Sequence, residues 1–115
     1  MARVRLPDRR PALTREIEHA GHRFSVTIGF DLCGRPREVF AGGAKIGTDL
    51  GQLIADHCVV VSLALQHGCT SAELEKSMGV VPDPASRPGV SRPASVFGVI
   101  AAIVSEAGQH PGSDG

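Results

Sequence analysis

The chain has 115 residues, and its 12 basic and 12 acidic side chains cancel to a formal charge of zero. This length suffices for one small domain and is too short for a barrel of about 250 residues or a two-domain enzyme. Hydrophobic residues make up 42% of the chain and charged residues 21%, which excludes a highly charged disordered chain and a membrane protein. With four phenylalanines and no tryptophan or tyrosine, a base-stacking surface for nucleic acid is not expected.

The first 12 residues form a basic lead that contains Arg3, Arg5, Arg9 and Arg10. No apolar stretch follows them as it would in a secretory signal, and the longest apolar run, 96–104, is far shorter than the roughly 20 residues that span a bilayer. We therefore expect a cytoplasmic protein without membrane contact. The arginines are candidates for docking on a partner or pairing with the chain's own carboxylates, and overall neutrality disfavours nucleic acid.

Three strands are expected before residue 42. Residues 13–19 alternate weakly, whereas Phe24, Val26, Ile28 and Phe30 alternate clearly with polar residues, as in a strand with one buried face. Turns at Ala20-Gly21 and at 31–36 separate these segments from a third strand at 37–41. The pattern predicts an antiparallel three-stranded meander with Ile17 on the buried face.

A long central helix is expected next, at 48–67, with Thr48 as N-cap and Gly68 at its end. Its second half is apolar on nearly all sides, so we expect that half to be enclosed by the sheet, the other helices or a partner subunit. Thr70 to Glu73 reads as a capping box for a short helix that ends near Gly79.

The last third contains four prolines between 81 and 93, which predict a long extended connection without regular structure. A final helix is expected at 93–107, capped by Ser91 and closed by Gly108, before a polar tail at 109–115. The predicted fold is α+β: one domain over 13–108, in which a three-stranded antiparallel meander packs against a long central helix, a short helix and a C-terminal helix.

The three cysteines contain no C-x-x-C pair, which argues against a disulfide framework and a zinc site. Cys58 lies in an apolar segment and should pack in the core. Cys33 in a turn and Cys69 before a helix are better placed for reactivity, because a helix N-terminus lowers a thiol pKa. Neither has a base nearby in sequence, so we assign no catalytic residue and no metal ligand.

One glycine-rich loop, between the third strand and the central helix, is the candidate ligand site. Backbone N–H groups and a lysine could converge there on a phosphate or nucleotide. The glycines could equally serve only a tight strand-to-helix connection. The residues assigned to the ligand are Gly43, Lys45, Gly47 and Thr48.

Three motifs, in this order and spacing, resemble the TSCPD domain. They are R-x-R-L-P-x-x-R-P at 3–11, G-R-P-x-E-x-F at 34–40 and S-L-A-L-Q-x-G at 62–68. The resemblance covers roughly residues 3–104. The Thr-Ser-Cys-Pro-Asp signature is absent, Cys33 stands where an acidic residue is usual, and Val81-Pro82-Asp83-Pro84 replaces the usual Phe-Glu-Pro.

The TSCPD resemblance implies a relation to adenosylcobalamin-dependent ribonucleotide reductases, in which this domain typically lies near the C-terminus. The reductase barrel, its catalytic cysteines and its cobalamin site are not encoded in these residues, so we expect no cofactor on this chain. The resemblance favours a non-catalytic accessory module of deoxyribonucleotide synthesis. The expected partner is a second copy of the chain or a larger protein, with a reductase as one candidate. The alternative is a small regulator that binds a nucleotide or phosphate at the loop 42–48.

Overall fold

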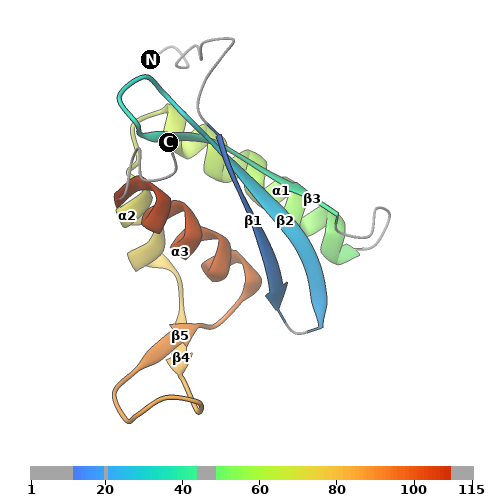
Figure 1. The fold of residues 1–115 in the computed structure, drawn as a ribbon, viewed down its shortest axis with the longest axis vertical. Helices are drawn as coiled ribbons and strands as arrows, with labels where there is room; N and C mark the ends of the chain where they lie inside the picture. The colour runs from blue at the N-terminus through green and yellow to red at the C-terminus, as the bar shows by residue number, and fades with distance from the viewer. Residues whose placement is uncertain (1–11, 20, 44–48, 110–115) are drawn as a thin grey trace.

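The computed structural model describes residues 12–19, 21–43 and 49–109, and it has the predicted α+β fold (Figure 1). One sheet contains β1 (Ala12–His19), β2 (His22–Phe30) and β3 (Pro36–Gly42), in that order and antiparallel. The helices are α1 (Asp49–Gln66), α2 (Ser71–Ser77) and α3 (Val96–Gln109), and β4 (Val80–Pro82) pairs with β5 (Ser91–Pro93). The predicted meander and all three helices are therefore confirmed.

The alternation in β2 decides which face of the sheet is buried. Val26 and Ile28 are fully buried, and in the register Ile28 pairs with Val39 of β3 and Leu13 of β1. Ile17, opposite Phe24, lies on the same face, as predicted. Each large aliphatic side chain buried in this way contributes about 1.5–3 kcal/mol.

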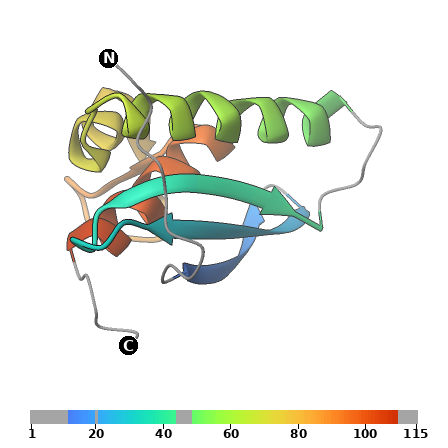
Figure 2. The same cartoon turned by 90° about the horizontal axis from the view of Figure 1, so that it is seen from above.

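Helix α1 runs alongside β3, and α3 completes the core (Figure 2). Ile54 and Leu65 of α1 and Ile100 of α3 are each at most 1% exposed and belong to the same cluster as the inner face of the sheet. Cys58 is 2% exposed within that cluster, which confirms it as a core residue.

The segment between α2 and α3 differs from its prediction, because residues 80–93 form a two-stranded ribbon rather than an irregular connection. Asp83 folds the turn of this ribbon: its carboxylate accepts hydrogen bonds from the Ala85 N–H (3.0 Å) and the Ser86 hydroxyl (3.1 Å). Of the four prolines that suggested an open connection, Pro82 and Pro93 stand at the strand ends, where their missing N–H is tolerated, and the other two lie between the strands.

The C-terminal helix also differs at both ends. It begins at Val96, and its cap is Ser95, whose hydroxyl accepts from the Gly98 N–H at 3.2 Å, because Ser91 belongs to β5. It continues through Gly108 to Gln109. A Cβ at Gly108 would lie 2.8 Å from the Ser71 hydroxyl oxygen, so this glycine permits close packing and does not end the helix.

Residues 12–19, 21–43 and 49–109 do not enclose the second half of α1. Val59, Val60 and Leu63 are 57%, 63% and 43% exposed. The sequence predicted that the sheet, the other helices or a partner subunit would enclose this half. In the described residues, the sheet and α3 cover one side of it only.

Candidate functional site

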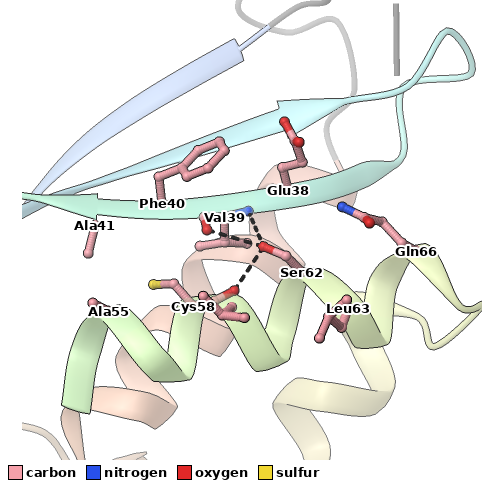
Figure 3. Close-up of a pocket in the computed structure, with 10 residues that line it drawn as sticks. Glu38, Val39, Phe40, Ala41, Ala55, Cys58, Ser62, Leu63 and Gln66 are labelled. Atoms are coloured by element: carbon pink, nitrogen blue, oxygen red, sulfur yellow. Dashed lines mark hydrogen bonds between the residues drawn. The ribbon is translucent and has the colours of Figure 1, made fainter. Parts of the chain in front are cut away.

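The G-R-P-x-E-x-F motif at 34–40 and the S-L-A-L-Q-x-G motif at 62–68, which are distant in sequence, meet where α1 packs against β3. Among the described strands β3 lies at the edge of the sheet, so none of them pairs with its outward backbone groups. The Ser62 hydroxyl accepts a hydrogen bond from the Val39 N–H at 2.9 Å (Figure 3). Gln66 Nε2 donates to the Arg37 carbonyl, also at 2.9 Å. Polar side chains of α1 thus take the place of a fourth strand along this part of β3.

Arg37 ties the same strand to the end of α1. Its guanidinium donates to the Leu65 carbonyl at 2.6 Å and to a carboxylate oxygen of Asp31 at 2.9 Å, and both charged side chains are 15% exposed. The other Asp31 oxygen accepts from the N–H groups of Cys33 (2.8 Å) and Arg35 (3.0 Å). The motif around 34–40 therefore builds a closed turn and a helix anchor.

The pKa of the Asp31 carboxyl reflects these contacts. Burial alone raises this pKa, but it is outweighed by the hydrogen bonds from the Arg37 side chain and from the Arg35 and Cys33 backbone, together with the Arg37 charge. The pKa therefore lies below its ordinary value, and the carboxylate is the form that the fold stabilises.

A groove of about 320 Å³ remains between β3 and α1 beside these anchors. Its walls are mostly apolar, and Phe40 points away from α1 on the strand side (Figure 3). The lining residues are Glu38, Val39, Phe40, Ala41, Ala55, Cys58, Val59, Ser62, Leu63 and Gln66.

One buried acceptor in this groove is unsatisfied. Gln66 is 2% exposed, and although its Nε2 is bonded to Arg37, its Oε1 has no hydrogen-bond partner among the described residues. A buried acceptor without a donor costs about 1–3 kcal/mol, so such groups usually mark a place where water or a ligand donates.

The groove is poorly suited to covalent chemistry. The Ser62 hydroxyl is held by the Cys58 carbonyl (2.8 Å) and the Val39 backbone, so its proton is engaged structurally. Burial raises the pKa of the Cys58 thiol to about 11, which keeps it protonated. The groove has the shape and chemistry to bind part of another molecule's surface, but it presents no activated nucleophile.

The loop proposed as a phosphate site lies largely outside the described residues. Lys45, Gly47 and Thr48 are in the undescribed segment 44–48, and only Gly43 can be placed: its φ of +76° fits the role of a connection glycine. Asp49 stands exposed in the first turn of α1. Its negative charge already complements the helix dipole and would repel a phosphate.

The other residues singled out in the sequence do not join the groove. Arg3, Arg5, Arg9 and Arg10 lie outside the described residues. The expectation that the helix N-terminus lowers the thiol pKa of Cys69 is wrong: partial burial and the charge of Glu73 raise it. Cys33 is exposed in its turn.

Sequence reasoning missed the two residues that shape the groove, Ser62 and Gln66. Their signal was present, because both are polar on a helix whose adjacent positions are apolar. His57 is a similar case: its ring stacks on Phe97 with centroids 4.2 Å apart, and burial lowers its pKa. It packs between α1 and α3.

Neither a metal site nor a membrane span is found in the described part of the chain. Across residues 12–19, 21–43 and 49–109 there is no group of three or more His, Cys, Asp or Glu side chains that could hold a metal ion. Within the same ranges, no helix has the length and hydropathy needed to cross a membrane.

Comparison with known proteins places this geometry in context. The TSCPD domain matches residues 2–107. A vitamin B12-dependent ribonucleotide reductase of Rhodopirellula baltica (strain DSM 10527 / NCIMB 13988 / SH1) is 38% identical over 66 residues, which are 57% of this chain and 6% of that protein. The chain thus matches a small part of that relative's length. No solved structure matches the chain.

Proposed function

Because the chain belongs to the TSCPD domain family, we propose that it is a non-catalytic accessory module that acts by contact with a protein partner, and that this partner is a vitamin B12-dependent ribonucleotide reductase. The relation to such a reductase rests on the 38% identical segment. The non-catalytic role is supported by the groove, in which the hydroxyl is engaged and the thiol is protonated.

The observation that carries the proposal is the unsatisfied Gln66 Oε1 in a groove whose walls are mostly apolar. This combination fits a partner that inserts an apolar side chain next to a hydrogen-bond donor, such as a backbone N–H or an amide. Phe40, 53% exposed at the rim, supplies the kind of aromatic contact that carries much of the energy at interfaces.

Binding to purified reductase tests the proposal. We expect the labelled chain to bind a vitamin B12-dependent reductase from the same cells, and Phe40→Ser to weaken binding by about tenfold or more. Leu32→Ser is the matched control, because Leu32 is 84% exposed in the turn before β3 and does not line the groove. Absence of binding, or equal loss in both variants, would contradict the proposal.

A second candidate function is a regulator that binds a nucleotide or phosphate at the loop 42–48. Its support is the position of this loop in the chain, directly after Ala41 of the groove. Titration with nucleotides while recording amide shifts of residues 42–49 tests it, with Lys45→Ala as the variant. Shifts that Lys45→Ala abolishes support the regulator, and silence at millimolar nucleotide eliminates it.

A further inference from the structure

The solvent side of α1 carries a regularly spaced row of side chains, half of them apolar, separate from the apolar stripe that faces the core. The row follows a spacing of four, three, four, three and four residues, and all six of its members are exposed. We call them the outer seam: Asp49, Leu53, Asp56, Val60, Leu63 and His67.

This spacing is the one that holds two helices together along a coiled coil. An average step of 3.5 residues keeps a row of side chains facing a partner helix over several turns. Leu53, Val60 and Leu63 are 54%, 63% and 43% exposed, so the apolar positions of the row are open. The core side of the same helix uses other residues, including Ile54, Cys58 and Val61.

We propose that the outer seam binds a second copy of this chain, with the two α1 helices antiparallel. In this arrangement, the residue numbers of any two residues that face each other across the interface add up to 116. Leu53 then meets the partner subunit's Leu63, and Val60 meets the partner subunit's Asp56. Each a position faces a d position, as antiparallel helix pairs require.

The charged and polar residues of the outer seam favour a second copy of the chain as the partner and an antiparallel arrangement of the two α1 helices. Antiparallel pairing places Asp49 at the start of one helix beside the partner subunit's His67, just beyond the end of the other helix, and a ring N–H of that imidazole can donate a hydrogen bond to the carboxylate. Parallel pairing would bring Asp49 onto the partner's Asp49 and Asp56 onto the partner's Asp56. In a two-fold symmetric interface the same residues of both subunits meet in reversed order, so the outer seam must be complementary to its own reversed copy, and it is.

This surface shares Leu63 with the groove of the proposed function and differs from that groove at every other residue. Leu53 does not line the groove, and Phe40 is not part of the seam. The two ideas can therefore fail separately: Phe40→Ser should leave self-association unchanged, and Leu53→Glu should leave the groove intact.

Sedimentation equilibrium of the full chain over a concentration series tests the proposal. We expect a monomer–dimer equilibrium, and a dissociation constant raised about 30-fold or more by Leu53→Glu or by Leu63→Glu, since each change occurs twice in a symmetric dimer. Leu32→Glu is the matched control, with the same change of charge at an exposed leucine outside α1. Because all three positions are exposed, far-ultraviolet circular dichroism should show the same fold in every variant.

Two further variants make the test sharper. Asp56→Leu removes the charge in the middle of the seam and should lower the dissociation constant. In a Cys33→Ser, Cys69→Ser background, Leu53→Cys mixed with Leu63→Cys should give the mixed disulfide, whereas neither alone should cross-link. A chain that stays monomeric at every concentration, a dimer that both glutamate variants leave unchanged, or self-cross-linking of either single variant would overturn the proposal.

Discussion

Both sides of α1 carry large aliphatic side chains, but only those of one side are buried. Ile54 and Val61 on the inner side are at most 2% exposed, whereas Leu53 and Val60 on the outer side are more than half exposed. The inner side is also tied to β3 by the Ser62 and Gln66 hydrogen bonds. Apolar residues alone therefore do not identify the core side of this helix. The outer side has an apolar content that the described fold does not use, and this is why we assign it a partner.

The largest difference between the two sides should appear on truncation of one side chain from each. Ile54→Ala removes buried methyl groups and leaves a cavity, so it should lower the free energy of unfolding by about 3 kcal/mol. Val60→Ala should change it by less than about 0.5 kcal/mol when the chain is dilute enough to be monomeric. Urea unfolding followed by circular dichroism measures both, and similar losses would contradict the division between the two sides.

Loss of the anchor between the inner side and β3 should have the next largest effect on stability. Asp31→Asn removes the charge that faces Arg37 and should cost about 2–3 kcal/mol at neutral pH, because hydrogen bonds to charged groups that are mostly buried are among the stronger ones. Glu106→Gln is the matched control: its ion pair with Arg15 spans 3.7 Å between side chains that are 60% and 45% exposed, and its loss should cost less than about 0.5 kcal/mol.

The same anchor predicts a pH dependence. The pKa of Asp31 is lower in the folded state than its ordinary value of 3.8, so its contribution is complete well above that value and is lost as the pH falls through it towards the folded pKa. The stability difference between the wild-type chain and Asp31→Asn should therefore shrink in acid. Urea midpoints measured from neutral pH down to about pH 3 test this sign, and a difference that grows in acid would refute it.

The smallest expected effect concerns the hydroxyl that pairs with the edge strand. Ser62→Ala leaves the buried Val39 N–H without its acceptor and should cost about 1–2 kcal/mol. Ser77→Ala is the matched control, because the Ser77 hydroxyl makes the same type of bond to the carbonyl four residues earlier, at 2.7 Å, but contacts no strand. Equal effects of the two substitutions would mean that the tie to β3 contributes nothing.

The parts of the fold that could be predicted were those governed by local periodicity. The alternation of β2, the capping box at Thr70 and the stop at Gly68 depend on near neighbours, and the structure has all three. The ribbon at 80–93 could not be predicted in this way, because its two strands are three residues each and are held by pairing across a turn that Asp83 closes. The prediction that Gly108 ends the last helix was wrong for a similar reason, because the role of this glycine depends on its close approach to Ser71 of another helix.

The amino-acid sequence by itself determined the order of the three-stranded meander and the three helices, the buried face of the sheet and the family. Only the tertiary structure decided that the second and third motifs meet, that Gln66 keeps an unsatisfied acceptor in a groove, and that the described residues leave the outer side of α1 uncovered. The physical reason is range: periodicity and capping act within a few residues. Burial and hydrogen-bond satisfaction depend on which distant segments come into contact, as β3 does with a helix more than twenty residues further along the chain.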